Sequence, residues 1–533
     1  FGMVAVVAFA FVVRVASRVV VFNAGRKAEY ELRSELEEQL TRLGPSFYRH
    51  MSTGDIMSRV TNDLVQVRLL LGFGVLNVCS TALALLSALA IMKQVSVPLT
   101  LAALSPLPLL LFASRKLSRE FYVRTRDAQA ALGEMSGRVQ TSIAGVRVIR
   151  SFALEEQELA AFERTNQTYL EKSLSLARLR GSLGPVLQLA LSAGLLVTFW
   201  YGGTLLIDGV IDAGGFLAFT RALARLAWPL ISVGFVLGLV QRGRAAYHRL
   251  AEVYRSEPDI ADGPLPAPAT VTGKLEVKRL SFAYGEHEVL EDVSFTIEPG
   301  RSLAIVGRTG SGKSTLAVLL ARLQPTPPRS VYLDGADVCD LPLATLRGAI
   351  GYAQQNAFLF STTAARNIGF PLDDPDSPEN RARVEVAASE AGVFDELTGL
   401  PDGFDTVVGE RGVQLSGGQK QRVALAMAFV SNPRILILDD PLSAVDARTE
   451  RRILEAIDRQ RAARSVLLVT HRVAAASRCD RIVVLDRGRV LEEGTHEELV
   501  QKGGLYATFA EEQRVESELE RLGHDPSEAA AVA

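Results

Sequence analysis

The sequence predicts two fold classes in one chain, an α-helical membrane domain followed by an α/β domain. Three observations support this. The 533 residues exceed the length of an ordinary single domain. Residues 1–250 carry long apolar runs, whereas residues 273–515 alternate short apolar runs with Gly, Asp and Arg. A proline-rich stretch separates the two. We expect a membrane domain at 1–255, a linker at 256–272, an α/β domain at 273–515 and a tail of unassigned role at 516–533.

Five apolar runs in the first region approach the length of about 20 residues that crosses a bilayer. They are Phe1 to about Val13 or Phe22, Leu71–Met92, Val97–Phe112, Pro185–Ile207 and Phe216–Val240. The connections near Lys93–Ser96 and Asp208–Gly215 are short and hold one basic residue, Lys93. We expect these short connections to lie outside the cell.

The segments Asn23–Leu70 and Ser114–Arg180 are long and rich in Arg. The positive-inside bias therefore places them in the cytoplasm, and their mixture of charged and apolar residues at helical spacing predicts extended helices. Because the α/β domain follows the last span on this same side, parity places Phe1 at the external face.

Two arginine pairs with i,i+4 spacing lie within these runs, so each pair shares one helix face. Arg14 and Arg18 lie near the cytoplasmic end of their run, where long side chains can reach polar surroundings. Arg221 and Arg225 lie inside the last run, ahead of a Trp-Pro step that can kink the helix. Two interpretations stay open for this second pair, a structural role and a cavity-facing role that favours substrates with an anionic or polar head.

The linker has the composition of an extended connector. Its run SEPDIADGPLPAPATVTG contains four prolines, which are incompatible with a helix. We place the domain boundary there.

A short apolar strand is expected at Ser302–Val306, with an apolar helix beginning at Leu316. Between them lie Gly307, Arg308, Thr309, Gly310, Ser311, Gly312, Lys313, Ser314 and Thr315. This is a P-loop. The glycines let the backbone N–H groups and the helix N-terminus face phosphate oxygens, Lys313 reaches the β and γ phosphates, and the Ser314 hydroxyl is a ligand for Mg²⁺.

A second apolar strand, Ile435–Leu438, ends in the acidic pair Asp439-Asp440. This is the placement of a Walker B motif, in which Asp439 holds Mg²⁺ directly or through water. A P-loop and an acidic pair together predict a nucleotide-binding domain, but they leave the biological process open.

Charge and cysteine content exclude other classes. The formal net charge of −2 gives no reason to expect a nucleic-acid partner. Cys79, Cys339 and Cys479 are far apart and lack CxxC spacing, so neither a disulfide framework nor a zinc site is expected. A reducing cytosol is the simplest location for the α/β domain.

A third motif, Leu415-Ser416-Gly417-Gly418-Gln419, lies upstream of the acidic pair. Together with the P-loop it resembles the signature of ABC ATPases, and the chain resembles one half of an ABC exporter of type IV fold. In that family two ATPase domains sandwich two ATP molecules head to tail. The resemblance implies that Ser416, Gly417, Gly418 and Gln419 contact ATP held by the P-loop of a second half-transporter. A half-exporter has six spans, so one span upstream of Phe1 is expected.

The resemblance assigns roles to further single residues. Tyr284 matches the aromatic residue that stacks on adenine. Gln355 matches the Q-loop glutamine that reaches Mg²⁺, with Gln354 as a weaker rival, and His471 matches the switch histidine at the γ-phosphate. Glu410 resembles the X-loop glutamate of exporters.

Three segments match family elements that connect the parts of the protein. Ser443–Asp446 resembles the D-loop. The run Thr53–Asp63 resembles the first intracellular loop, and the second coupling helix is expected near Gly145–Glu156.

Asp440 departs from the family pattern. Many members have Glu at this position as the general base, and a carboxylate one methylene shorter predicts slow hydrolysis at this chain's own site. The run Leu438–Asp446 resembles the hydrolytically weak member of bacterial heterodimeric multidrug exporters. We favour a heterodimer over a homodimer in which Asp440 is still catalytic.

The sequence therefore predicts ATP-driven export of a small hydrophobic or amphipathic substrate across the bacterial cytoplasmic membrane. The ATPase domain is expected in the cytosol, with ATP and Mg²⁺ as ligands. A soluble ABC ATPase of DNA repair or translation is disfavoured by the apolar spans. An importer of exporter fold and a silent regulatory half stay open.

Overall fold

The computed structural model describes residues 1–409, 415–442, 447–461 and 464–524, and it leaves some side chains within residues 107–118, 183–234 and 516–524 undescribed. Glu410 and Ser443–Asp446, to which the sequence assigns roles, lie outside the described residues. The chain forms two compact units: Phe1–Glu38 with Gly54–Arg255, and Gln39–Thr53 with Ser256–Ala533. We describe each unit separately. The second unit includes Gln39–Thr53, a segment that we expected in the membrane domain.

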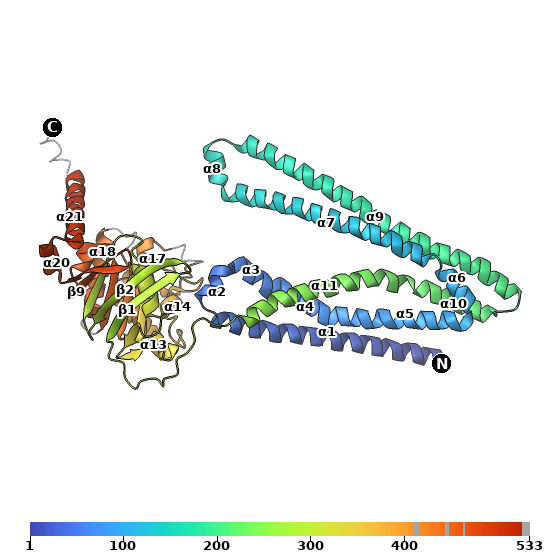
Figure 1. The fold of residues 1–533 in the computed structure, drawn as a ribbon, viewed down its shortest axis with the longest axis horizontal. Helices are drawn as coiled ribbons and strands as arrows, with labels where there is room; N and C mark the ends of the chain where they lie inside the picture. Colours follow the sequence, from blue (N-terminus) through green and yellow to red (C-terminus); the bar gives the residue numbers. More distant parts are fainter. Residues whose placement is uncertain (410–414, 443–446, 462–463, 525–533) are drawn as a thin grey trace. The chain divides into compact units, whose positions relative to one another are not determined.

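The first unit is built from long helices joined by short connections (Figure 1). In chain order they are α1 (Gly2–Arg42), α3 (Thr53–Ser58), η1 (Arg59–Asp63), α4 (Leu64–Leu69), η2 (Leu70–Gly74), α5 (Val75–Val95), α6 (Val97–Leu104), α7 (Leu107–Ala144), α8 (Val146–Ser151), α9 (Glu155–Ile207), α10 (Ala213–Arg225) and α11 (Ala227–Arg255). Two of the segments, η1 and η2, are π-helical turns inside an otherwise continuous helix.

Two helical stretches among the described residues have the length and apolarity needed to cross a membrane, Gly2–Arg42 and Thr53–Val95, and a shorter apolar stretch covers Ser192–Ile207. The expected span at Val97–Phe112 is interrupted between α6 and α7, next to Pro106. Proline cannot donate a backbone hydrogen bond, so a helix break there is expected. The last expected span is likewise divided at Leu226, between α10 and α11.

Local capping fixes the ends of the helices around the two short connections. The Ser96 hydroxyl accepts a hydrogen bond from the Leu99 amide (3.3 Å) at the start of α6, and Asp212 accepts one from the Gly215 amide (2.9 Å) at the start of α10. Helices α5, α6, α9 and α10 then pack around a shared apolar core. Its buried residues are Ala88, Met92, Leu99, Ala103, Ile211, Phe219, Ala222, Leu223 and Leu226.

The second unit is an α/β domain with two sheets. Its strands are β1 (Leu275–Tyr284), β2 (His287–Ile297), β3 (Ser302–Val306), β4 (Val331–Leu333), β5 (Ala336–Asp337), β6 (Ile350–Ala353), β7 (Ile435–Asp439), β8 (Ser465–Thr470), β9 (Arg481–Asp486) and β10 (Arg489–Gly494). The order in the antiparallel sheet is β2-β1-β4-β5, and in the larger sheet it is β10-β9-β3-β8-β7-β6. Strands β9, β3, β8, β7 and β6 run parallel.

The helices of this unit are α2 (Pro45–His50), α12 (Lys313–Leu320), α13 (Leu343–Ala349), α14 (Ala364–Ile368), α15 (Pro378–Glu390), α16 (Phe394–Thr398), the 3₁₀ turn η3 (Gly403–Asp405), α17 (Gly417–Val430), α18 (Ala447–Arg461), α19 (Val473–Ala476), α20 (His496–Lys502) and α21 (Leu505–His524). Helix α21 continues beyond residue 515, where we expected the tail to begin.

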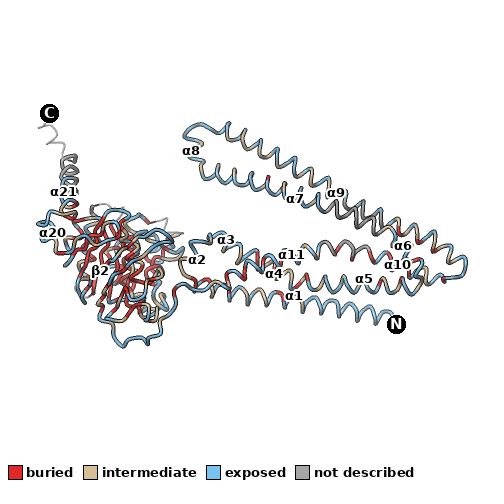
Figure 2. The backbone as a smooth tube through the Cα atoms, in the orientation of Figure 1, coloured by how far each residue is buried: buried red, intermediate tan, exposed pale blue. Residues whose placement is uncertain are grey.

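The larger sheet is buried on both faces. Alternate residues of a strand point to opposite sides, and along β3 the side chains of Leu303 and Ile305 enter one core while Ala304 and Val306 enter another. A parallel sheet covered on both faces requires such apolar strands, as β3 and β7 provide. Buried residues are accordingly dense in this unit and sparse along α1 and α9 (Figure 2).

Candidate functional site

Four segments singled out from the sequence meet at one edge of the larger sheet. Strands β3, β8, β7 and β6 are consecutive neighbours and parallel, so their carboxyl ends lie along the same edge. The P-loop follows β3, His471 follows β8, Asp440 follows β7, and Gln355 lies just beyond β6. Ligands of open α/β sheets bind at this edge.

The P-loop has the backbone that its glycines predict. Gly310 and Gly312 have φ of +84° and +99°, a region that side chains with a Cβ rarely adopt. A Cβ at Gly307 would lie 2.1 Å from the Leu485 carbonyl oxygen, so no larger residue fits there. Helix α12 begins at Lys313, within the last residues of the motif, so its N-terminus faces the turn formed by residues 307–312.

Lys313 is folded into the loop. Its Nζ donates hydrogen bonds to the carbonyl oxygens of Gly307 (2.7 Å) and Arg308 (2.8 Å). Burial lowers the pKa of Lys313, against the attraction of Asp440 and Asp439. A phosphate group next to Nζ would supply negative charge that stabilises the protonated amine in this buried position.

The Ser314 hydroxyl donates a hydrogen bond to Asp439 Oδ1 (2.9 Å), which joins the P-loop to the end of β7. Burial raises the pKa of Asp439, although Ser314, Lys313 and Tyr352 oppose that rise. Tyr352, on β6, is a contact that we did not single out, although it lies in the same sequence run as Gln355.

Asp440 lies between Gln355 and His471. Gln355 Nε2 is 3.4 Å from Asp440 Oδ2, and His471 Nδ1 is 3.2 Å from Asp440 Oδ1. Asp440 Oδ1 is buried, yet it accepts no hydrogen bond of regular geometry from the described residues. Asp440 also has φ of +47°, a left-handed conformation that Asp tolerates better than most residues with a side chain.

A cavity of about 360 Å³ joins these groups. It is lined by Tyr284, Val289, Thr309, Gly310, Gly312, Lys313, Ser314, Thr315, Gln355, Asp439, Asp440, Val469 and His471. The predicted metal ligands, the predicted adenine residue and most of the predicted phosphate-binding residues therefore share one space, whereas Gly307, Arg308 and Ser311 are not among the residues that line it. None of Ser416, Gly417, Gly418 and Gln419 is among the described residues that line it.

Tyr284 lies at the end of β1 and is partly exposed, with Phe282 edge-on at 4.9 Å between ring centroids. The guanidinium carbon of Arg49, which belongs to α2, lies 5.3 Å from the centroid of the Tyr284 ring. Arg49 also donates a hydrogen bond to Gln324 Oε1 (3.0 Å). Arg49 thus contributes a cation to the face of the ring that we expect to stack on adenine.

The signature run forms the N-terminus of α17. Ser416 and Gln419 make a reciprocal capping box, in which the Gln419 amide donates to Ser416 Oγ (3.2 Å) and the Ser416 amide donates to Gln419 Oε1 (2.8 Å). One turn further, the guanidinium of Arg422 is buried and makes two hydrogen bonds with Glu396 of α16, at 2.9 and 2.8 Å. Arg422 also donates to the carbonyl oxygens of Gly392 and Gly418.

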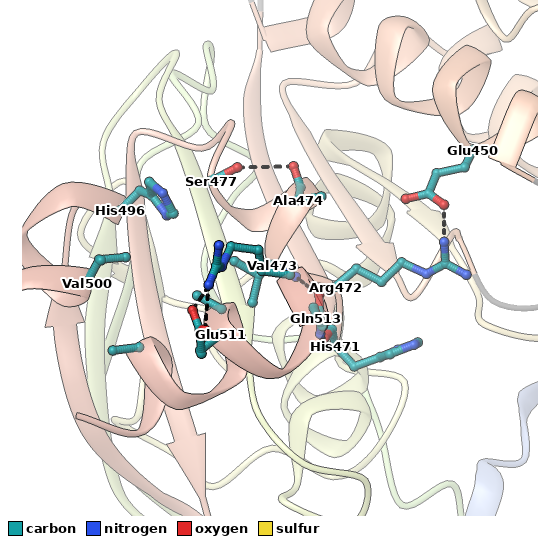
Figure 3. A pocket seen from close by; sticks show the side chains of 13 residues that line it. Glu450, His471, Arg472, Val473, Ala474, Ser477, His496, Val500, Glu511 and Gln513 are labelled. Atoms are coloured by element: carbon teal, nitrogen blue, oxygen red, sulfur yellow. Dashed lines mark hydrogen bonds and ion pairs between the residues drawn. The ribbon is translucent and has the colours of Figure 1, made fainter. Parts of the chain in front are cut away.

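A second cavity, of about 740 Å³, lies beside His471 and against α21 (Figure 3). On its wall the Gln513 side chain holds the backbone on both sides of Arg472. Its Nε2 donates to the His471 carbonyl oxygen (2.7 Å), and its Oε1 accepts from the Val473 amide (2.7 Å). Arg472 in turn forms an ion pair with Glu450 of α18. The sequence pattern did not reveal Gln513, because its contact depends on how α21 packs.

Two known protein families match parts of this chain. The family described as ABC transporter transmembrane region matches residues 1–230, and the family described as ABC transporter matches residues 290–443.

The probable multidrug resistance ABC transporter ATP-binding/permease protein YheI of Bacillus subtilis is 36% identical over 497 residues, which cover 93% of this chain and 84% of YheI. The multidrug resistance-like ATP-binding protein MdlA of Escherichia coli is 34% identical over 530 residues, which cover 99% of this chain and 89% of MdlA. A solved bacterial Atm1-family ABC exporter with ATP bound has a TM-score of 0.77 and 28% identity, covering 93% of this chain and 87% of its own. The chain therefore belongs to the ABC transporters of exporter type, in which a helical transmembrane domain and an ATPase domain are joined in one polypeptide and ATP hydrolysis is coupled to transport.

Proposed function

We propose that this chain is one half of a heterodimeric exporter in the bacterial cytoplasmic membrane, which it spans several times. It moves a hydrophobic or amphipathic substrate outward, and its own nucleotide site hydrolyses ATP slowly. The relatives named for multidrug resistance support the export of such substrates. The observation that carries the asymmetry is Asp440, which stands where a longer Glu would serve as general base.

In this proposal residues 307–315 bind the ATP phosphates and Tyr284 stacks on adenine. The signature residues 416–419 complete the partner's site, which agrees with their absence from the described lining of this chain's own cavity. Gln355 and His471 hold the attacking water and the γ-phosphate beside Asp440.

Ser314, Asp439 and Gln355 are the proposed ligands of Mg²⁺. Their donor atoms are hard oxygens, which Mg²⁺ prefers. Burial raises the pKa of Asp439, so a nearby cation would stabilise its ionised form. The described residues include no cluster of three or more His, Cys, Asp or Glu side chains that could hold a metal without help. A cation shared with phosphate oxygens fits this sparse set, and Mg²⁺ there would neutralise charge on the phosphates.

The geometry around Asp440 supports a weak site. Its Oδ1 accepts no regular hydrogen bond from any residue that the structure describes, and its contact with Gln355 is long, so the groups that should orient a water are poorly joined. A positioned general base contributes about 10²–10⁴-fold to the rate. Loss of most of that factor would leave a site that binds ATP and hydrolyses it rarely.

ATPase activity in lipid tests this proposal. The chain is purified alone and together with the half-transporter encoded beside it. We expect the lone chain to be nearly silent, the pair to turn over, and Asp440→Glu to raise the lone chain's turnover at least about tenfold. Brisk hydrolysis by the lone chain, with little gain from Asp440→Glu, would instead make the protein a homodimer with an adequate base.

Direction is tested separately. Inside-out vesicles that contain the pair should accumulate a labelled amphipathic dye only with ATP, and Ser416→Ala in this chain should reduce that uptake. ATP-dependent loss of dye from the same vesicles would identify an importer of exporter fold.

A further inference from the structure

Helix α10 has two chemically different faces within the membrane unit. One face packs into the apolar core through Phe219, Ala222, Leu223 and Leu226. The opposite face is exposed and consists of Leu217, Ala218, Arg221, Ala224 and Arg225. The spacing of Arg221 and Arg225 by four residues places both guanidinium groups on this exposed face, about one helical turn apart.

This charge lies deep in the apolar span. Helix α10 begins after Asp212, in the short external connection, and rises about 1.5 Å per residue. Counted from Phe216, where the expected span begins, Arg221 and Arg225 lie roughly 8 and 14 Å inside, so Arg225 is near the middle of a hydrocarbon core of about 30 Å and Arg221 is about a quarter of the way through it. Arg225 is too far from either end of the span for its side chain to reach the membrane surface, and Arg221 lies one turn away on the same exposed face.

Neither the five apolar runs nor the ion pairs of the described residues supply these arginines with a counter-charge. The five apolar runs contain no Asp and no Glu. None of the ion pairs among the described residues includes Arg221 or Arg225, whereas Arg68 and Arg249 in the same unit pair with Glu29 and Asp63. A second copy of these five runs would bring no carboxylate either.

The helix dipole explains the position of only one of the two arginines. Arg225 lies in the last turn of α10, which ends before the break at Leu226, and a positive charge is favoured there by the helix dipole. That effect is weaker than the cost of a charge inside the membrane, and it falls off within one turn, so it does not account for Arg221. A charged face of this kind points to water or to an anion rather than to lipid tails.

We propose that Arg221 and Arg225 form an anion-binding subsite in the transport pathway, and that the transported substrates are anionic amphiphiles. A carboxylate, sulfate or phosphate group would contact both guanidinium groups, while the apolar part of the molecule lies against Leu217 and the two alanines of the same face. This inference rests on the proposed export function and adds the charge of the substrate to it.

Two probes that differ only in charge test the subsite. They are 11-(dansylamino)undecanoic acid and its uncharged methyl ester, and their fluorescence reports binding to the dimeric transporter in phosphatidylcholine nanodiscs without nucleotide. The variants are Arg221→Gln/Arg225→Gln, the charge-preserving Arg221→Lys/Arg225→Lys, and the matched pair Arg14→Gln/Arg18→Gln. The matched pair has the same residues and spacing but lies near the cytoplasmic end of its run.

We expect the Gln variant at 221 and 225 to raise the Kd of the acid at least about tenfold, which corresponds to about 1.4 kcal/mol. The Kd of the ester should change less than about twofold, the Lys variant should stay within about threefold of wild type, and the matched pair should change neither probe. If the double Gln variant does not fold, the single variants carry the test with about threefold each.

Three results would overturn the subsite. Unchanged binding of the acid would show that something else, such as a carboxylate of the partner subunit, neutralises the pair. Equal loss of both probes would show a structural role. If phosphatidylglycerol in the nanodiscs competes with the acid in wild type but not in the Gln variant, the pair binds lipid head groups and the substrate assignment is wrong. Charge-selective binding without ATP-dependent uptake into inside-out vesicles would instead keep the subsite and reject export.

Discussion

Arg422 makes the contact whose loss we expect to cost the most stability in the ATPase unit. Its side chain is 3% exposed, and it donates to Glu396, Gly392 and Gly418. Arg422→Met keeps most of the apolar stem and removes the charge. Breaking a buried ion pair costs about 3–5 kcal/mol when one charge is left unpaired. Because Glu396 is 28% exposed and keeps Arg452 as a second partner, we expect about 2–3 kcal/mol.

A matched control uses the same carboxylate. Arg452 lies 3.1 Å from Glu396 but is 42% exposed, so Arg452→Met should cost about 0–1 kcal/mol. At about 2–4 °C per kcal/mol for a large domain, Arg422→Met should lower the melting temperature of the ATPase unit by roughly 4–12 °C. Both tryptophans, Trp200 and Trp228, lie in the membrane unit, so calorimetry of the full chain is the appropriate assay.

The same variant should also affect catalysis, because Arg422 is one turn from the capping box that presents Ser416. We expect the turnover of the complete dimer to fall more than the loss of folded protein explains. Equal melting temperatures for Arg422→Met and Arg452→Met would refute the reasoning, since they would show that burial of Arg422 adds nothing to its pairing with Glu396.

Three further changes have defined outcomes. Gln513→Ala removes two hydrogen bonds to the backbone beside His471, each of which contributes about 1 kcal/mol or less. It should slow single-turnover hydrolysis at this chain's own site about fivefold. Glu512→Ala, on the same helix, is the neutral control. The pKa of Asp480 is lowered, because the hydrogen bonds from Ser302 and the charges of nearby arginines outweigh the effect of burial. Ser302→Ala should therefore reduce the free energy of unfolding by its full amount at pH 7. This difference from wild type, measured by urea unfolding, should shrink as the pH falls below about 4 and Asp480 is protonated. Ser314→Ala should weaken nucleotide binding more with Mg²⁺ than with EDTA, as fluorescent-ATP titration would detect; an equal loss in both would contradict a metal-ligand role.

The part of the site that could be predicted is local in sequence. The P-loop, Asp439 and His471 each follow an apolar strand, and the parallel order of those strands brings their carboxyl ends together. The continuous apolar runs and the glycine spacing predict the strands and the loop directly, whereas the order of the strands in the sheet is known from the structure. Strand β3 covers residues 302–306, as expected, because its apolar run is local in the sequence.

The contacts that could not be predicted are long-range. Gln513 meets His471 across 42 residues, and that contact depends on the packing of α21, whose periodicity says nothing about its neighbour. The assignment of residues 39–53 to the ATPase unit has no compositional signal either, since this segment has the same mixture of charged and apolar residues as the helices around it. The left-handed backbone of Asp440 is likewise set by its surroundings, in which its amide donates to the Val469 carbonyl oxygen.

The position of Arg49 over Tyr284 gives helix α2 a direct share in the thermodynamics of nucleotide binding. An adenine ring that stacks on the face of Tyr284 that Arg49 covers must displace the guanidinium, so on that face the energy of base stacking and the position of α2 depend on each other. Such linkage is reciprocal: whatever moves α2 changes the affinity for the base by the same factor by which the base shifts α2. Through this linkage, a residue of α2 that lies outside every nucleotide-binding motif would respond to the size of the bound base.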